Sequence, residues 1–247
     1  MHALKALVTG HSRGLGAAVA EALLQRGIPV LACARQENTA LAARFPELLR
    51  QQRIDLADTG ALAAWLDGEA LDLFCADAST LILINNAGVL GPVGSLDSQN
   101  PAAIGQAVAL NVGAPLMLAA ALAQRHDGEL RILHISSGAA RFAYPGWSIY
   151  GATKAALDQH ARAVAAGNRD DRRICSLAPG VIDTDMQAEI RGLSETSFPM
   201  LKKFQKLKRN GLLTPPAEAA ARIVDYVLDP EFGALVTADL RELISGE

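Results

Sequence analysis

Short apolar runs alternate with longer amphipathic segments along most of the chain. The apolar runs, at 6–9, 30–34, 81–85, 130–136 and 174–178, are rich in aliphatic residues and end in small or turn-forming residues, which is typical of strands. The segments between them, at 15–26, 59–66, 101–123 and 149–166, have helical length and spacing. Because the strands lack polar alternation, both of their faces should be buried, as in a mostly parallel sheet with helices on each side. The pattern predicts a single doubly wound α/β domain of the Rossmann type over residues 1–247, with strand order resembling 3-2-1-4-5-6.

The pattern loosens between residues 183 and 214. This segment is expected to be a helical excursion over the carboxyl edge of the sheet, where it would act as a substrate lid. It carries the cations Lys202, Lys203, Lys206, Lys208 and Arg209. These side chains could attract an acidic substrate, or they could be the solvated face of a helix.

Composition and charge favour a small-molecule partner. Half of the residues are hydrophobic and 20% are charged, which indicates a globular protein and excludes a mainly disordered or collagen-like chain. The formal net charge is −3, from 23 basic and 26 acidic residues, so no global field favours nucleic acid or an anionic membrane. We find no run of about 18 uncharged apolar residues and expect no membrane span.

The cysteines and the amino terminus indicate in which cellular compartment the protein is expected. Cys33, Cys75 and Cys175 are odd in number and form no C-x-x-C pair, so we expect buried thiols in a reducing compartment. The chain enters an apolar strand within a few residues of Met1, which leaves no room for a signal peptide. These features predict a cytoplasmic protein. The histidines show no metal-ligand spacing, so no metal site is expected.

A glycine-rich turn, Thr9-Gly10-His11-Ser12-Arg13-Gly14-Leu15-Gly16, separates the first strand from the first helix. Without Cβ atoms, the backbone N–H groups of such a turn can approach a pyrophosphate. The turn also contains the G-x-S-x-G pattern of an α/β-hydrolase nucleophile elbow, with Ser12 as the nucleophile. That alternative needs an earlier strand and a histidine late in the chain, but only nine residues precede Gly10 and the last histidine, His160, lies in a helical pattern. Dinucleotide binding is therefore favoured.

The end of the second strand bears on which dinucleotide binds. Ala34-Arg35 lacks the carboxylate that holds the ribose 2′-hydroxyl in NAD-binding folds. Arg35 and Arg13 could instead pair with a 2′-phosphate, which favours NADPH. Arg35 could also be an ordinary solvated side chain. Because the carboxylate of Glu37 lies close in sequence, NAD stays possible as the cofactor.

Tyr150 and Lys154 lie four residues apart, so on a helix their side chains share one face. The ammonium group should lower the pKa of the phenol and make Tyr150 a usable proton donor. Ser136 and Ser137 end the fifth strand at the carboxyl edge, where a hydroxyl can hydrogen-bond a substrate carbonyl. Taken singly, each residue also fits an ordinary helix surface or strand end.

The order and spacing of these motifs resemble the short-chain dehydrogenase/reductase family over nearly the whole chain. Besides the glycine turn, Ser137 and the Y-x-x-x-K pair, the sequence carries Asp55-Leu56, Asn85-Asn86-Ala87-Gly88, Asn111 and Pro179-Gly180-x-x-x-Thr184. The resemblance implies a catalytic tetrad of Asn111, Ser137, Tyr150 and Lys154. It also implies reversible hydride transfer, in which Tyr150 protonates the developing alkoxide, Lys154 binds the nicotinamide ribose and Asn111 holds a water that joins Lys154 to solvent.

The same resemblance implies contacts with NADPH or NADP+. Asp55 would bind the adenine amine, Asn86 would lie near the ribose and Thr184 would contact the carboxamide, although Asp55 and Asn86 also fit ordinary turns. The expected contacts are Gly10, Ser12, Arg13, Gly14, Leu15, Gly16, Arg35, Asp55, Leu56, Asn86, Ala87, Gly88, Tyr150, Lys154, Pro179, Gly180, Ile182 and Thr184.

The run at 178–187, APGVIDTDMQ, resembles the sepiapterin reductase and benzil reductase branch, whose members reduce vicinal dicarbonyls with NADPH. Phe142, Tyr144 and Trp147 could line an aromatic substrate pocket, or could pack against loops or a partner subunit. Asp239 lies where the pterin-reducing members place a substrate-anchoring carboxylate, although a surface loop position fits it as well. A small ketone or vicinal dicarbonyl is the expected substrate.

Other functions stay open at this point. They are a general ketone or sugar-alcohol dehydrogenase, a 3-ketoacyl-thioester reductase and a non-catalytic nucleotide-binding sensor. The complete tetrad favours an enzyme over a sensor. The alanine-rich helices at 101–123 and 149–166 resemble the family's dimerisation helices, so a homodimer or homotetramer is expected.

Overall fold

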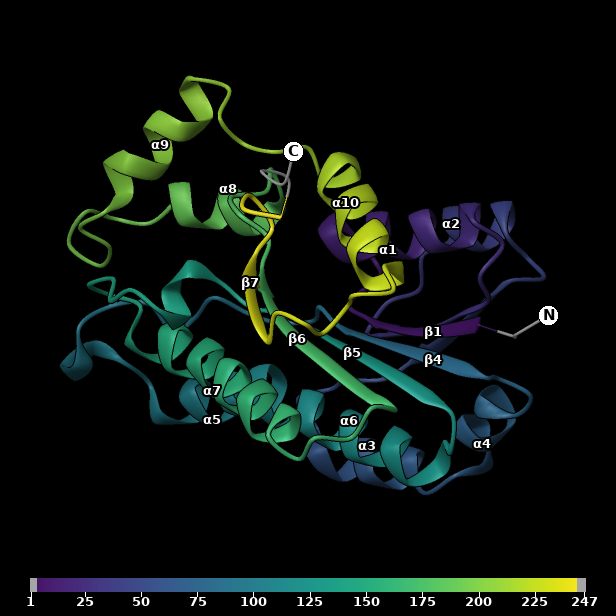
Figure 1. Cartoon of the computed structure of the whole chain (residues 1–247). Coiled ribbons are helices and arrows are strands. Elements are labelled where there is room, and N and C mark those ends of the chain that lie inside the picture. The colour runs from purple at the N-terminus through teal and green to yellow at the C-terminus, as the bar shows by residue number, and fades with distance from the viewer. Residues whose placement is uncertain (1–3, 244–247) are drawn as a thin grey trace.

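The computed structural model describes residues 4–243 as one parallel sheet with helices on both faces (Figure 1). Over these residues the sheet has seven strands in the order β3-β2-β1-β4-β5-β6-β7, which confirms the expected order and adds a seventh strand. Residues 1–3, which bear on the expected absence of a signal peptide, and residues 244–247 lie outside the described chain.

The strands are β1 (Leu4–Thr9), β2 (Val30–Ala34), β3 (Leu49–Arg53), β4 (Thr80–Asn85), β5 (Glu129–Ile135), β6 (Arg172–Ala178) and β7 (Thr237–Asp239). Five of them coincide with the apolar runs, with ends shifted by at most two residues. The edge strand β3 has the sequence LRQQR, in which only Leu49 is buried, so it shows no apolar run. The short strand β7 pairs with the end of β6, from Ser176 to Ala178.

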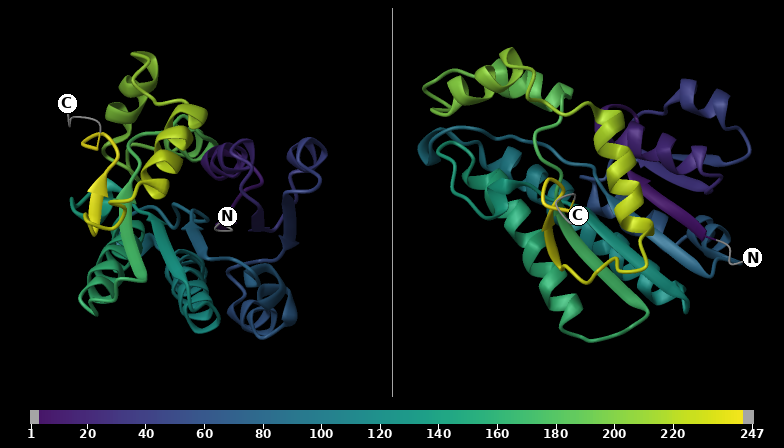
Figure 2. Two further views of the ribbon diagram at one scale, coloured as in Figure 1. Left: turned by 45° about the vertical axis from the view of Figure 1, so that its right-hand side comes forward. Right: turned by 45° about the horizontal axis from the view of Figure 1, so that its top comes forward.

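The α-helices are α1 (Gly14–Gln25), α2 (Thr39–Arg44), α3 (Thr59–Leu66), α4 (Glu69–Cys75), α5 (Pro101–Val108), α6 (Ala114–Arg125), α7 (Ser148–Ala165), α8 (Asp185–Arg191), α9 (Leu201–Arg209) and α10 (Pro216–Leu228). Helices α1 and α10 cover one face of the sheet, and α3 to α7 cover the other (Figures 1 and 2). Alternate strand residues fill the two layers. On β4, for example, Ile82 and Ile84 face the α1 side, and Leu81 and Leu83 face the α6 side.

The expectation that no segment is long and apolar enough to cross a membrane is wrong. Residues 101–125 form one helical stretch in which a π-helical turn, Ala109–Gly113, joins α5 to α6. By length and composition alone, this stretch is long and apolar enough to cross a membrane. In the fold, Ala114, Leu118 and Leu122 of this stretch belong to the core layer beneath the sheet.

The segment at 183–214 is helical, as expected, and carries α8 and α9 beyond the carboxyl edge of the sheet (Figure 1). An aromatic cluster attaches it to the chain before α7. The Trp147 ring stacks on Phe198 with centroids 4.5 Å apart and planes 10° apart, and lies 5.3 Å from the Phe204 ring. The segment is therefore held over the end of the sheet by apolar contacts.

All three cysteines are buried and free, as expected for buried thiols. Burial raises the thiol pKa in each case, to about 12 at Cys33 and about 11 at Cys75 and Cys175. These thiols are therefore inert at neutral pH.

Candidate active site

A cleft of about 960 Å³ lies along the carboxyl edge of the sheet, between the strand ends and helices α8 and α9. Every residue expected to contact the cofactor lines it. Three residues of the expected tetrad, Ser137, Tyr150 and Lys154, also line it, whereas Asn111 lies behind its wall. The fold therefore brings the sequence motifs together in one place.

The glycine turn is packed tightly against the loop after β4. Thr9 Oγ1 accepts hydrogen bonds from the backbone N–H groups of Asn86 and Ala87, both at 3.0 Å. The Asn86 amide donates to the Thr9 carbonyl at 2.9 Å, so this side chain braces the two loops. A Cβ atom on Gly16 would lie 2.2 Å from the Gly10 oxygen, and only glycine fits there.

This turn fits the diphosphate of a dinucleotide. Gly10 and Gly14 have positive φ angles of 74° and 58°, which glycine adopts without strain. Arg13 precedes α1 and makes no side-chain cap, so the first N–H groups of the helix stay open toward the cleft. Open N–H groups at a helix N-terminus bind phosphate.

Three arginines line the cleft near the glycine turn and the ends of β2 and β3: Arg13, Arg35 and Arg53. The sequence analysis missed Arg53, which ends β3 directly beside Ala34 of β2. The sequence feature that could have pointed to Arg53 is its position two residues before Asp55, which was already expected to contact the cofactor. Asp55 lines the cleft. Its carboxylate also accepts a hydrogen bond from the Ala57 N–H at 3.0 Å, as expected for an aspartate that stabilises a turn. Glu37 does not line the cleft.

Tyr150 and Lys154 are both buried on one face of α7, but the electrostatics differ from the expectation. Lys154 Nζ donates to the Ile135 carbonyl at 2.8 Å and lies 5.7 Å from the centre of the Tyr150 ring. Burial lowers the pKa of Lys154 to about 8, and the nearby Asp158 carboxylate opposes this shift. Burial raises the pKa of Tyr150, and the Ser137 hydroxyl only partly offsets it. The expectation that Lys154 lowers the pKa of the phenol is therefore wrong here, because desolvation dominates and the ammonium points to a carbonyl.

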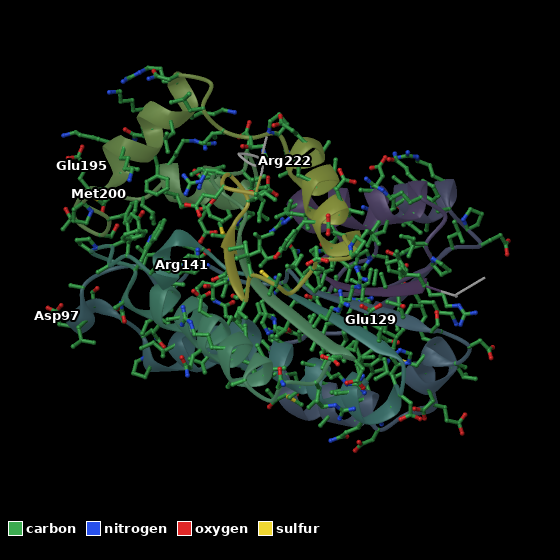
Figure 3. All side chains as sticks on the ribbon, viewed as in Figure 1. Asp97, Glu129, Arg141, Glu195, Met200 and Arg222 are labelled. Atoms are coloured by element: carbon green, nitrogen blue, oxygen red, sulfur yellow. The ribbon has the colours of Figure 1, made fainter. Side chains whose placement is uncertain are left out.

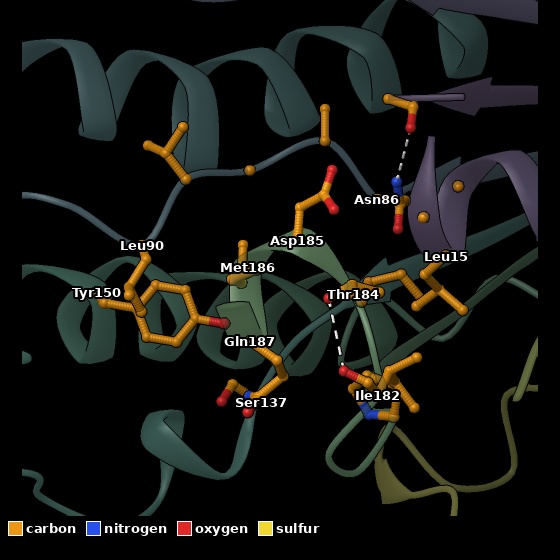
Figure 4. A pocket seen from close by; sticks show the side chains of 18 of the residues that line it. Leu15, Asn86, Leu90, Ser137, Tyr150, Ile182, Thr184, Asp185, Met186 and Gln187 are labelled. Atoms are coloured by element: carbon orange, nitrogen blue, oxygen red, sulfur yellow. Dashed lines mark hydrogen bonds between the residues drawn. The ribbon is translucent and has the colours of Figure 1, made fainter. Parts of the chain in front are cut away.

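The structure separates the two serines at the end of β5. Ser136 is buried and donates its hydroxyl proton to Asp158 at 2.8 Å. Ser137 lies in the pocket that also holds Tyr150, and its oxygen accepts a hydrogen bond from the Ala139 N–H at 3.1 Å (Figure 4). Ser137 therefore faces the cleft, where its hydroxyl also lies within hydrogen-bond reach of Tyr150.

Asn111 lies in the π-helical turn behind Lys154. Its amide oxygen accepts from the Val89 N–H at 2.9 Å, and its amide nitrogen donates to the Val89 carbonyl at 2.9 Å and to Thr153 Oγ1 at 3.1 Å. This side chain is thus fully used in fixing the loop after β4. Pro115 lies four residues on and has no N–H, so the Asn111 backbone carbonyl lacks its usual helical donor.

The opposite end of the cleft is mainly apolar. Its lining includes Leu90, Tyr144, Trp147, Met186, Ile190 and Phe204. Phe142 does not belong to it, since this side chain is 68% exposed outside the cleft. Of the five cations in the lysine-rich segment, Lys203 lines the cleft, and its ammonium lies 5.7 Å from the Tyr144 ring centre. Lys202 and Lys208 form ion pairs with Glu195 and Asp183.

Asp239 is buried in the cleft wall, so its placement in a surface loop is wrong. Its two oxygens accept from the Arg241 guanidinium at 2.8 and 2.6 Å, and one of them also accepts from the Arg241 backbone N–H at 3.0 Å. This pairing lowers the pKa of the Asp239 carboxyl. Arg241 is therefore a second cleft residue that sequence reasoning missed.

Comparison with known proteins identifies the family. Residues 4–193 match the short chain dehydrogenase family. The chain belongs to this family. It is an oxidoreductase of that class, and the family implies a nicotinamide cofactor.

Several relatives of this short-chain dehydrogenase cover nearly its whole length. A benzil reductase ((S)-benzoin forming) from Bacillus cereus is 32% identical over 236 residues, which cover 92% of this chain and 94% of that protein. A sepiapterin reductase from Xenopus laevis is 32% identical over 238 residues, covering 90% and 89%. The crystal structure of a short-chain dehydrogenase/reductase from Burkholderia vietnamiensis is 48% identical with a TM-score of 0.71 and covers 98% of each chain. The resemblance to the benzil and sepiapterin reductase branch is confirmed.

The family assignment excludes the hydrolase alternative for this short-chain dehydrogenase. His160 lies on α7, where its Nδ1 is 3.1 Å from Nε2 of the buried His134, and it does not act on Ser12. Over residues 4–243 no group of three or more His, Cys, Asp or Glu side chains could hold a metal ion.

Proposed function

We propose that this short-chain dehydrogenase is an NADPH-dependent carbonyl reductase that acts on a small vicinal dicarbonyl. The observation that carries the proposal is that Ser137, Tyr150 and Lys154 come together in one cleft. On one side of them lie the open N-terminus of α1 and three arginines, and on the other side lie apolar and aromatic side chains. A phosphate-binding end and an apolar end on either side of hydroxyl groups suit a nucleotide cofactor and an uncharged carbonyl compound.

The preference for NADPH rests on the cations at the adenosine end. Arg35 directly follows β2, and Arg53 ends the neighbouring strand β3. Arg13 lines the same cleft from the glycine turn, where its Nε also lies 3.3 Å from the Asp185 carboxylate. Guanidinium groups match the charge and geometry of a 2′-phosphate, and at this end the lining supplies no carboxylate from the tip of β2 to hold a 2′-hydroxyl.

The residues of the cleft have separable roles in the reaction. A nicotinamide cofactor bound in the cleft would supply the hydride that the carbonyl carbon accepts. Ser137 donates a hydrogen bond to the carbonyl oxygen, and Tyr150 gives its hydroxyl proton to the alkoxide that develops there. Lys154, buried one turn from Tyr150, lines the cleft and would hold the nicotinamide ribose. A water on the Asn111 carbonyl would then return a proton through Lys154.

The substrate end favours a compact apolar dicarbonyl over a pterin. Tyr144, Trp147 and Phe204 provide aromatic surface. A pterin would need the Asp239 carboxylate, which Arg241 already holds with both of its oxygens engaged. A benzil-like diketone requires no such anchor, and a relative at 32% identity carries the name benzil reductase.

We also propose that the enzyme is a cytoplasmic homodimer or homotetramer that assembles through α5 and α7. Val108 of α5 is 45% exposed, and α5 packs directly against α7. Light scattering at micromolar concentration should show two or four copies, and a monomer would contradict this proposal.

The test is a panel of carbonyl compounds in an NADPH-consumption assay. Benzil, sepiapterin, an acetoacetyl thioester and a simple sugar represent the competing substrate classes. We expect benzil to give the highest kcat/KM. Preferential use of the thioester or the sugar would overturn the substrate assignment, and inactivity on every compound would favour a nucleotide-binding sensor.

A further inference from the structure

Two buried polar groups in the cleft have no hydrogen-bond partner. Within residues 4–243, the indole nitrogen of Trp147 and the amide oxygen of Gln187 are the orphaned buried side-chain atoms that belong to cleft-lining residues. A buried polar group without a partner destabilises a protein. The two cleft-lining residues that carry such groups are therefore candidates for contact with a ligand.

Gln187 is placed by the start of α8. Its backbone N–H donates to the Thr184 carbonyl at 3.0 Å, so its position is tied to the residue expected to meet the carboxamide of the cofactor. The residue is only 8% exposed, and its side chain extends into the pocket toward the end that holds Ser137 and Tyr150 (Figure 4). The amide thus makes no hydrogen bond within the described chain.

We propose that Gln187 binds the second oxygen of a vicinal dicarbonyl and so selects this substrate over a monoketone of the same shape. This inference rests on the proposed carbonyl reductase function. Ser137 and Tyr150 hold the oxygen of the reacting carbonyl, and a substrate of this class carries its other oxygen on the adjacent carbon. An amide that lines the same pocket and points toward these two hydroxyls is suitably placed to reach it.

The chemistry of the amide matches this role. The Gln187 amide nitrogen carries two N–H donors, and among the described residues it has no acceptor, so it is available to a ligand in the cleft. The N–H groups donate to a carbonyl oxygen of the dicarbonyl. The same contact is kept in the hydroxyketone product, whose remaining carbonyl is still an acceptor.

A monoketone leaves the amide unpaired. It fills the same space but brings no acceptor to Gln187, and the closed complex then contains a desolvated amide. Sites that hydrogen-bond a substrate group reject analogues that lack it far more strongly than apolar pockets reject a missing methylene. Gln187 is therefore a specificity-determining residue for the proposed reaction.

The test compares Gln187→Met with the wild type on benzil and on 1,2-diphenylethanone, which is benzil without one carbonyl oxygen. Methionine keeps the length of the side chain and removes its hydrogen bonds. We expect kcat/KM for benzil to fall about 10- to 100-fold, with less than about a threefold change for the monoketone, measured as an inhibition constant if it is not turned over. NADPH affinity, measured by fluorescence, should stay within about twofold and confirms that the variant is folded.

Trp147→Phe is the matched comparison, because it removes the other orphaned polar group and keeps an aromatic ring. It should change kcat/KM for the two compounds by similar factors. Three results would overturn the role of Gln187. The first is an equal loss of kcat/KM on both compounds in Gln187→Met, and the second is a weakened NADPH affinity in that variant. The third is that the preference for benzil over the monoketone is lost in Trp147→Phe and kept in Gln187→Met. A wild type that reduces benzil leaves the proposed function standing in all of these cases, whereas a wild type inactive on every carbonyl overturns both.

Discussion

Lys154 and Asp158 lie one turn apart on the buried face of α7, and only 4% and 1% of their surfaces are exposed. The Asp158 carboxylate accepts hydrogen bonds from Ser136 and Ser176 and from Arg141, at 2.8, 2.7 and 3.1 Å. Arg141, at the end of the sheet in Figure 3, also donates to the carbonyl of Ala238 in β7 at 3.1 Å. A buried anion thus joins the ends of three strands directly beneath the lysine of the active site.

The low pKa of Lys154 predicts how stability changes with pH. The pKa of Lys154 is about 8 in the folded protein, and the ordinary value for lysine is 10.5. Between these two pH values the unfolded chain binds more protons than the folded protein, so the free energy of unfolding rises with pH. The buried ammonium costs about 3 kcal/mol below pH 8. We expect Lys154→Met to raise the melting temperature at pH 7, by an amount that shrinks toward pH 10.5. A gain that is independent of pH in thermal unfolding would contradict this assignment.

Asp158→Asn should weaken both the fold and the active site. The variant leaves Arg141 without its anion and removes acceptor capacity from the two buried serines, so we expect a loss of about 2–4 kcal/mol in urea unfolding. Because Asp158 raises the pKa of Lys154, the alkaline limb of the activity profile should also move to lower pH. The control is Asp225→Asn, which breaks the exposed ion pair with Arg26 and should cost less than about 1 kcal/mol. Equal losses in the two variants would contradict a special role for Asp158.

The sequence predicts those features that depend on local spacing. The apolar runs predict the five buried strands, and the four-residue spacing of Tyr150 and Lys154 predicts their shared face. The polar edge strand β3 has no such signal, because one of its faces packs and the other is solvated. Local sequence patterns therefore predict the buried strands of the sheet but not its polar edge strand β3.

Features that depend on tertiary packing could not be predicted in this way. The pKa of Tyr150 rises because neighbouring segments bury it, and no spacing along α7 reveals that burial. Asp158 gains its partners from β5, β6 and the loop that carries Arg141. Gln187 has an unpartnered amide only because α8 turns it into the cleft.

The cofactor preference can be tested at the tip of β2. Arg35→Ala should weaken NADPH binding about 10- to 100-fold, since a hydrogen bond between charged groups contributes about 1.5–3 kcal/mol. NADH carries no 2′-phosphate, and its affinity should change less than about twofold. Arg50→Ala on β3 removes an exposed arginine outside the cleft and should change neither affinity. Fluorescence titration of both cofactors decides the matter, and equal weakening of both would remove the support for a 2′-phosphate site.

Tyr150→Phe tests the proton donor with the least change to the structure. The ring of Tyr150 is buried and lies edge-on to Trp147 with centroids 5.5 Å apart, and phenylalanine keeps this packing and removes only the hydroxyl. We expect NADPH affinity within about threefold of the wild type and a fall in kcat of about 10²–10⁴-fold, the range for loss of a positioned acid. Tyr226→Phe, which alters a tyrosine on α10 outside the cleft, should leave kcat unchanged. Because Ser137 would still hold the carbonyl oxygen, residual turnover in Tyr150→Phe should depend on proton donation by water. Turnover equal to the wild type would place the proton donor elsewhere.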